Sequence, residues 1–196
     1  MLPDLHQNST LFYVILWVFF CINFVEKIKK MVDVSLQMGS SFILAGPSSC
    51  GKSSFIRNLI KCRNNIFNRN IRNVYIVCSN VQSIYEDLVK SKDVKKIFYE
   101  MPTEDEIREI AKIEKGRGGT ILILDDILPE IEKSNLLIQK MFTEIAHHWD
   151  MSIFLCVQNL FYRSDLFRTL SLNAAYLIPF KHPRDTVTFM IILFNL

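Results

Sequence analysis

A chain of 196 residues is long enough for one α/β domain with a core of its own. Hydrophobic residues make up 49% of it and charged residues 22%, which is typical of a globular protein and excludes a disordered one. Its 23 basic residues are nearly offset by 20 acidic ones. The net charge of +3 therefore permits contact with nucleic acid but does not argue for it.

The first 36 residues precede the expected domain. Residues 1 to 10 are polar, and Leu11 to Val25 is an apolar run, interrupted at Asn23, that is shorter than the roughly 20 residues a membrane-spanning helix needs. The run could be a short or tilted anchor, with the basic flank from Glu26 to Lys30 in the cytosol. A signal peptide fits less well, because no basic segment precedes the run and no small-residue cleavage site follows it. The segment could also be an artefact of the start site, with Met31 as the true start.

The segment from Gly46 to Ser53 fits G-x-x-x-x-G-K-[ST], the phosphate-binding loop of nucleoside triphosphatases. An apolar run, Ser41 to Ala45, predicts a buried parallel strand before it, and Ser54 to Ile60 has helical spacing after it. Glycines let successive N–H groups turn inward, and the start of the helix adds its positive dipole end. Lys52 would reach the β- and γ-phosphates of ATP, and the hydroxyl of Ser53 would hold Mg²⁺. The candidate nucleotide-binding residues are Gly46, Pro47, Ser48, Ser49, Cys50, Gly51, Lys52, Ser53 and Ser54.

Cysteine usage fits a reducing compartment. None of the five cysteines stands in C-x-x-C spacing, and Cys78 and Cys156 lie in apolar runs, as buried thiols do. Cys50 lies inside the phosphate-binding loop, where a disulfide would block function.

The middle of the chain predicts alternating strands and helices. A polar connector from Asn64 to Asn73 leads into a strand over Val74–Cys78, and Ser83–Lys90 follows as a helix. A short strand is expected over Lys95–Tyr99. Thr103 and Glu106 form the pattern of a capping box, which opens a helix that runs to about Lys115 and ends at the glycines from Gly116 to Gly119.

Thr120 to Asp126 is the second chemical motif, in which four aliphatic residues are followed by two aspartates. Carboxylates at the C-terminal end of a buried strand lie on the ligand-binding edge of an open α/β sheet. Asp125 would hold Mg²⁺ through water together with Ser53, and Asp126 would polarise the attacking water. The motif follows the phosphate-binding loop by about 70 residues, a gap that admits another strand between the two motif strands.

The last third of the domain adds a candidate sensor. Asn135–His148 predicts a helix with Leu136, Leu137, Met141, Ile145 and His148 near one face. The adjacent pair His147 and His148 favours a helix-end or interface role over a metal site. Met151–Val157 predicts a strand beside the aspartate strand, and the amide of Gln158 at its tip is placed to sense the γ-phosphate or orient water.

Two arginines follow among aromatic residues. Arg163 and Arg168 are each a candidate arginine finger that enters a neighbouring subunit's site, or else a surface ion-pair residue. Asn173–Phe180 predicts a further strand. The apolar tail over residues 187–196 reads as truncated. We therefore expect residues 1–36 to lie outside the core, 37–186 to form the domain, and 187–196 to be a tail.

With these residues in hand, the sequence resembles the poxvirus-type DNA-packaging ATPases of the FtsK/HerA superfamily, and most of all the copies in polinton-like elements and large DNA viruses. The resemblance runs from about Phe42 to Asp185 and covers neither terminal segment. It rests on Gly46 to Ser53, Val74 to Leu88, Leu122 to Asp126, Phe142–Thr143, His147–His148, Gln158 to Phe161, Arg168 to Ala174 and Phe180 to Asp185.

The resemblance implies a P-loop NTPase of the RecA/ASCE type, an α/β three-layer sandwich with a mostly parallel central sheet. It implies a ring-forming motor that uses Mg²⁺ and ATP to drive double-stranded DNA into a capsid, with Lys52, Asp126 and Gln158 in catalysis. It also implies an intracellular location, in the nucleus, in the cytoplasm or at the site of virion assembly. The apolar run Leu11–Val25, which the resemblance does not cover, remains a candidate membrane contact. The alternative is a degenerate or domesticated copy that binds ATP and moves no DNA. A small-molecule kinase fits less well, because the pair Asp125 and Asp126 is followed by a Gln-tipped strand and the sequence has no Arg-rich lid segment.

Overall fold

The computed structural model describes residues 35–80, 82–114, 118–127, 135–159 and 165–180. The apolar run Leu11–Val25, Arg163 and the tail over residues 187–196 lie outside the described residues. Within the described ranges, no helix is both long enough and apolar enough to cross a bilayer.

Six parallel strands form one sheet, in the order β3-β2-β4-β5-β1-β6. The sequence predicted a mostly parallel sheet, and all the described pairings are parallel. The strand between the two motif strands β1 and β4 is β5, which comes last of the three in the sequence. The strands are β1 (Ser41–Ala45), β2 (Ile71–Cys78), β3 (Lys96–Phe98), β4 (Gly119–Asp125), β5 (Met151–Val157) and β6 (Tyr176–Pro179).

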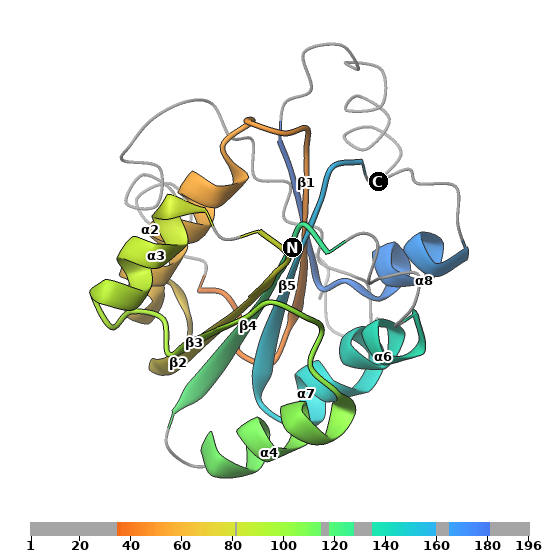
Figure 1. Cartoon of the computed structure of the whole chain (residues 1–196). Coiled ribbons are helices and arrows are strands. Elements are labelled where there is room, and N and C mark those ends of the chain that lie inside the picture. The colour runs from red at the N-terminus through yellow and green to blue at the C-terminus, as the bar shows by residue number, and fades with distance from the viewer. Residues whose placement is uncertain (1–34, 81, 115–117, 128–134, 160–164, 181–196) are drawn as a thin grey trace, which may run out of the picture.

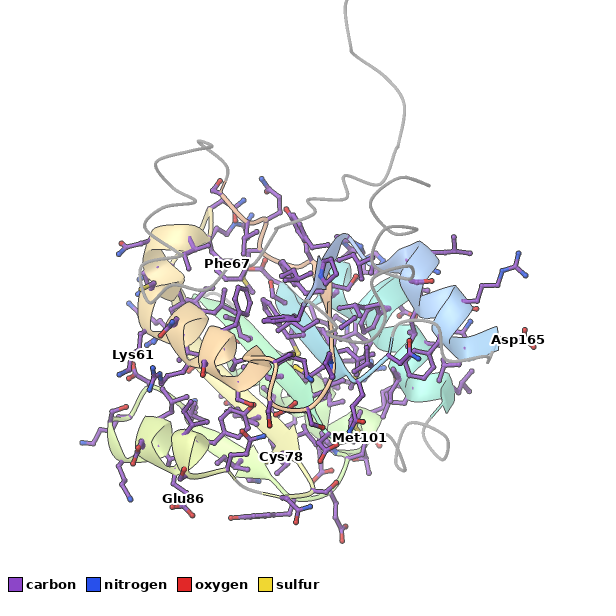
Figure 2. All side chains as sticks on the ribbon, turned by 90° about the horizontal axis from the view of Figure 1, so that it is seen from above. Lys61, Phe67, Cys78, Glu86, Met101 and Asp165 are labelled. Atoms are coloured by element: carbon purple, nitrogen blue, oxygen red, sulfur yellow. The ribbon has the colours of Figure 1, made fainter. Side chains whose placement is uncertain are left out.

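Helices cover both faces of the sheet, which gives the expected three layers (Figure 1). One face packs against α2 (Lys52–Ile66) and α3 (Ser83–Lys90). The other packs against α4 (Glu104–Glu114), α6 (Asn135–Lys140), the π-helical turn η1 (Met141–Ile145), α7 (Ala146–His148) and α8 (Asp165–Asn173). Figure 2 shows side chains filling the space beside the sheet, while Lys61 and Glu86 point outward.

The central strands are mostly apolar because both of their faces are covered. Every residue of β1, β4 and β5 is buried. On the face below α2, the ring of Phe42 is stacked between those of Phe154 and Tyr176, with centroids 4.2 and 4.5 Å away. These three rings belong to β1, β5 and β6. The aromatic stack therefore holds β1, the strand that leads into the phosphate-binding loop, against both of its neighbours.

Two predicted boundaries are corrected by the structure. The connector expected over Asn64–Asn73 is much shorter, because α2 continues to Ile66 and β2 begins at Ile71. Asn64 continues the helix and closes the turn, since its side-chain oxygen accepts a hydrogen bond of 2.7 Å from the backbone N–H of Ile71. The last strand is also shorter than predicted, because α8 extends to Asn173 and β6 begins only at Tyr176.

The helix predicted over Asn135–His148 is present, and Met141 and Ile145 of its predicted face are buried, but the rest of the buried face differs from the prediction. The π-helical turn η1 interrupts the α-helical spacing and rotates the residues on either side of it. Leu136 is 80% exposed and His148 is exposed, whereas Ile138 and Phe142 are buried instead.

The capping box predicted at the start of α4 is confirmed. Glu106 accepts a hydrogen bond of 2.8 Å from the N–H of Thr103, and the Thr103 hydroxyl accepts one from the N–H of Glu106.

We expect Phe42→Ala to lower the free energy of unfolding by about 3–5 kcal/mol, the usual cost of deleting a buried aromatic ring. The reason is the loss of two stacked contacts at once. Urea denaturation measures the effect, and Leu172→Ala, at a side chain that is 57% exposed, is the control and should change stability by less than about 0.5 kcal/mol. A loss for Phe42→Ala as small as that of the control would contradict this account of the core.

Candidate active site

The loop from Gly46 to Gly51 joins β1 to α2 and is closely packed at both ends. The N–H of Gly46 donates to the carbonyl of Val157 at 3.0 Å, which ties the loop to β5. A Cβ on Gly46 would lie 2.6 Å from the Cβ of Phe180, so no larger residue fits there. Gly51 has φ +101°, a left-handed conformation that glycine adopts without strain. The two glycines of the motif are therefore required by packing at one end and by backbone conformation at the other.

The backbone N–H groups at the N-terminus of α2 have no side-chain partner. No side chain caps it, and no acidic residue stands in its first turn. The first N–H groups of a helix have no partner within the helix, and they attract anions when no side chain satisfies them. The start of α2 is therefore suited to a phosphate group.

Lys52 is folded back onto the loop. Its Nζ donates to the carbonyl oxygen of Gly46 at 2.5 Å and to that of Pro47 at 2.9 Å, and lies 3.9 Å from the sulfur of Cys50. Two neutral carbonyls hold the ammonium less strongly than an anionic phosphate does. An incoming phosphate can therefore compete for Lys52.

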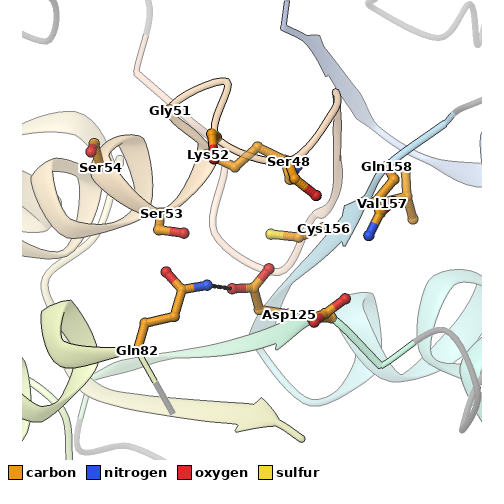
Figure 3. Close-up of a pocket in the computed structure, with 12 residues that line it drawn as sticks. Ser48, Gly51, Lys52, Ser53, Ser54, Gln82, Asp125, Cys156, Val157 and Gln158 are labelled. Carbon is orange, nitrogen blue, oxygen red and sulfur yellow. Dashed lines mark hydrogen bonds between the residues drawn. The ribbon is translucent and has the colours of Figure 1, made fainter. Parts of the chain in front are cut away.

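Asp125 faces the loop because of its position in β4. Alternate residues of a strand point to opposite faces, and Ile121 and Ile123 pack on the α2 side, which places Asp125 on that side too. Its side chain is buried, and its residue is only 4% exposed. The Tyr85 hydroxyl donates to its Oδ2 at 2.5 Å, and the Gln82 amide lies 3.5 Å from the same oxygen (Figure 3).

Burial raises the pKa of Asp125, while the hydrogen bond from Tyr85 and the charge of Lys52 act in the opposite direction. Burial, with a smaller contribution from Asp125, also raises the pKa of Tyr85 and of Cys156 and brings that of Cys78 to about 11. These thiols and the phenol therefore stay protonated at neutral pH. They can donate hydrogen bonds but do not add negative charge beside the carboxylate.

Asp126 lies beyond the end of β4, and the prediction that it continues the strand is wrong. Its φ is +54°, so the chain turns sharply there, and the side chain is exposed. The Ser79 hydroxyl donates to its backbone carbonyl at 3.2 Å and helps to hold the turn. A left-handed non-glycine residue is strained, and such strain is frequent at functional sites.

One cavity of about 400 Å³, here called the loop pocket, brings most of the predicted residues together (Figure 3). Lys52 and Ser53 line it from the start of α2, Asp125 and Asp126 from the end of β4, and Gln158 from the tip of β5. The lining also includes Ser48, Ser49, Gly51, Ser54, Gln82, Cys156 and Val157. Residues far apart in the sequence thus meet at the C-terminal edge of the sheet.

Some of the predicted residues do not line this cavity. Gly46, Pro47 and Cys50 form the base of the loop, and the first two contact the site through their carbonyls on Lys52. Arg168 is an exposed residue of α8 and does not line the loop pocket. Arg163 lies outside the described residues.

Sequence reasoning missed the contribution of α3. Gln82 is the N-cap residue just before this helix and Tyr85 lies in its first turn, and both reach Asp125. The side chain of Ser53 is also near enough to lower the pKa of Tyr85, against the larger effect of burial. Finding them requires the knowledge that β2, which leads into α3, pairs with β4. No local pattern in the sequence supplies that order.

No protein-family model matches the sequence, and no curated protein does. Solved structures are similar to it. The cytoplasmic domain of EssC aligns with a TM-score of 0.54 at 16% identity, over 79% of this chain and 33% of that one. PH0250 from Pyrococcus horikoshii OT3 aligns with a TM-score of 0.53 at 12% identity, over 80% and 87%. The genome packaging NTPase B204 of Sulfolobus turreted icosahedral virus 2, solved with AMP, aligns with a TM-score of 0.44 at 14% identity, over 78% and 81%.

The fold is that of a P-loop NTPase. The chain spans only about a third of the EssC domain that it resembles. At these identities the likeness establishes the fold, and the chemistry has to be argued from the side chains.

The donors in the loop pocket fit a magnesium ion held with a nucleotide. Ser53 and Asp125 line the same pocket, and both contribute to the pKa of the Tyr85 hydroxyl, so the two predicted metal-binding side chains lie close together. Among the described residues no group of three acidic, His or Cys side chains could hold a metal. One carboxylate and one hydroxyl suit Mg²⁺, which takes its remaining ligands from phosphates and water.

We expect Tyr85→Phe to destabilise the fold by about 1–3 kcal/mol, because it leaves the buried carboxylate of Asp125 without its shortest donor. Thermal unfolding in the presence of EDTA measures this without a contribution from bound metal. Tyr176→Phe is the matched control: Tyr176 is also buried, but its hydroxyl accepts from the backbone N–H of Gln37 and touches no charge. Equal losses in the two variants would show that the contact with Asp125 is not special.

Proposed function

We propose that this chain binds and hydrolyses Mg·ATP and couples hydrolysis to translocation of double-stranded DNA. The observation that carries the catalytic part is the meeting of five predicted side chains, Lys52, Ser53, Asp125, Asp126 and Gln158, in the loop pocket. These side chains come from three separate segments, and each matches a role that phosphoryl transfer requires.

The phosphate-binding loop and α2 would hold the triphosphate. The N–H groups at the start of α2 supply hydrogen bonds to phosphate oxygens, and Lys52 would exchange its two carbonyl partners for the β- and γ-phosphates. Ser53 and Asp125 would hold the metal ion, which supplies charge neutralisation to the phosphates when bound. Tyr85 keeps the Asp125 carboxylate in one orientation by donating to it.

Asp126 and Gln158 would activate and orient the attacking water. The turn at Asp126 directs an exposed carboxylate to the rim of the loop pocket, where it is not engaged with Tyr85. A carboxylate in this position can accept a proton from water, and the Gln158 amide on the neighbouring strand can orient the same water or contact the γ-phosphate. The two aspartates thus have different surroundings, as their proposed roles in metal binding and in water activation require.

A second subunit would complete the site. Lys52 is the only basic residue that lines the loop pocket in the described part of the chain. Phosphoryl transfer commonly uses a further cation, which a neighbour can insert as an arginine finger. Arg168 is exposed and free to act across an interface, and Arg163 is the other candidate. This is the reason for proposing a ring-shaped homo-oligomer.

The proposal of DNA as the cargo rests on the sequence resemblance to DNA-packaging ATPases, most of all on the segments after Phe142. The mild net charge neither requires nor opposes it. An intracellular setting is proposed on the same grounds.

We expect Lys52→Ala to abolish ATP hydrolysis and Asp126→Asn to slow turnover by at least about a hundredfold while nucleotide binding persists. Phosphate release measures turnover, and equilibrium binding of a fluorescent ATP analogue measures affinity. Lys61→Ala and Asp105→Asn are matched controls at exposed positions on α2 and α4. If Asp126→Asn hydrolyses ATP at the wild-type rate, Asp126 is not the base.

Duplex DNA should stimulate the hydrolysis of ATP if the chain is a translocase. The measurement is the ATPase rate as a function of duplex concentration, on protein shown to be folded and oligomeric. A rate that rises to a plateau supports coupling. A hydrolysis rate that no concentration of DNA changes would point to a nucleotide-binding switch or a domesticated copy.

A further inference from the structure

A second hollow lies at the opposite end of the strands that form the loop pocket. It has a volume of about 500 Å³ and is here called the basal groove. Gly118 and Thr120 line it at the start of β4, and Asp150 lines it just before β5. The remaining lining residues are Arg69, Arg108, Ala111, Lys112, His147, His148 and Trp149. The loop pocket contains the ends of the same two strands, so the two sites are separate.

The basal groove is lined by more cations than acids. Arg69, Arg108 and Lys112 face a single acid, Asp150, and two exposed histidines add further donors. With neutral histidines the lining carries a charge of +2, against +3 for the whole chain. Within the described residues, Lys112, His147 and His148 form no ion pair. Arg69 is paired with Asp150 and Arg108 with Glu104, so within the described residues Lys112 is the cation of the groove that has no acidic partner.

Arg108 is held in place before any ligand arrives. Its guanidinium lies 5.1 Å from the ring centroid of Trp149, and its Nη2 lies 3.0 Å from a carboxylate oxygen of Glu104. Glu104 is itself anchored by Lys140 at 2.7 Å. A guanidinium fixed in this way loses little conformational freedom when it binds a planar or anionic group.

The turn that leads into β5 is strained and fixes the other wall. Asp150 has φ +53°, and its carboxylate makes hydrogen bonds of 3.1 and 3.0 Å to Arg69. Trp149 is half-buried and packs against the core, so its indole has a fixed position. The groove thus combines two arginines held by ion pairs with an aromatic residue in a fixed position.

We propose that the basal groove binds a nucleic-acid strand, with Arg108, Lys112 and the two histidines on its phosphates and the Arg108–Trp149 pair beside a base. Phosphate contacts need cations, and bases stack on aromatic rings and on guanidinium planes. The flat guanidinium–indole pair favours nucleic acid over an acidic peptide, which has no planar groups to stack. The inference extends the proposed function by giving the DNA a contact surface, but the groove itself is derived from charge and packing.

The test is a pair of double variants matched in residue type, spacing and charge. Arg108→Ala with Lys112→Ala removes an arginine and a lysine one helical turn apart on α4. Arg57→Ala with Lys61→Ala removes the same pair at the same spacing from exposed positions on α2. Fluorescence anisotropy of a labelled DNA duplex, and of its single strand in a second series, measures affinity over a range of salt concentrations.

The α4 double variant should weaken binding by roughly tenfold or more and reduce the slope of log K against log salt by about 2, since each phosphate contact contributes about 0.9. The α2 double variant should change neither quantity, and basal ATP hydrolysis should be unchanged in both. Equal weakening in the two variants would overturn the inference, because it would show that general charge alone drives binding. Because Arg108 also supports Glu104 and Trp149, Lys112→Glu is the second variant, at an exposed side chain without an ion pair, and it should weaken binding as well.

A direct readout is available at Trp149. The chain has two tryptophans, and Trp17→Phe leaves Trp149 as the only indole fluorophore. DNA should quench its emission, and poly-glutamate of the same charge should not. Absence of quenching by DNA, or equal competition by poly-glutamate, would overturn the assignment to nucleic acid. If the wild type hydrolyses ATP but the α4 double variant binds DNA normally and DNA does not quench Trp149, the groove inference fails and the ATPase proposal stands. If DNA binds in the groove but no ATP is hydrolysed, the ATPase proposal fails and the groove inference stands.

Discussion

The contact between the Tyr85 hydroxyl and the carboxylate of Asp125 is the constraint on which the rest of the site depends. A carboxylate in an apolar interior is costly unless donors surround it. Asp125 meets this requirement with the Tyr85 phenol from α3 and the amide of Gln82, the residue just before that helix. The thiol of Cys156 on β5 also favours the charged form of the carboxyl group. These groups reach the Asp125 carboxylate only if β4 lies between β2 and β5 and α3 begins close to the C-terminal end of β4. The strand order and the position of α3 are therefore tied to one buried charge.

The alternation of side chains along the strands determines what else faces that charge. Cys156 and Asp125 are paired neighbours on β5 and β4, and both lie on the α2 side of the sheet. A shift of one residue in β4 would turn Asp125 toward α4 and α8, among apolar side chains. The unbroken apolar runs in these strands do not fix that register, because both faces of the sheet are buried. The register is set by polar groups: the carboxylate, its donors and the loop that is tied to β5 through Gly46 and Val157.

The sequence predicted the elements whose signals are local. The bounds of β1, β5 and α3 agree with the prediction because continuous apolar runs and their polar ends mark them. The phosphate-binding octet and the capping box are equally local. What it did not predict is non-local: Gln82 and Tyr85 reach the site only because β2 pairs with β4, and no periodicity encodes which strands pair. The π-helical turn η1 was also missed, since one extra residue in a helical turn changes the exposed face without changing the composition.

The loop pocket and the basal groove lie at the two ends of β4, whose seven residues span roughly 20 Å at the usual rise of a strand. At that distance a charge in one site acts only weakly on a charge in the other, because salt screens interactions beyond about 8–10 Å. A buried central strand also cannot shift along its neighbours without breaking the ladder on both sides. If nucleotide turnover and strand binding are coupled, movement of whole subunits against one another would carry the coupling without a shift of β4. A ring would provide this movement, because an arginine that one subunit inserts into its neighbour's loop pocket would move together with the basal groove of its own subunit.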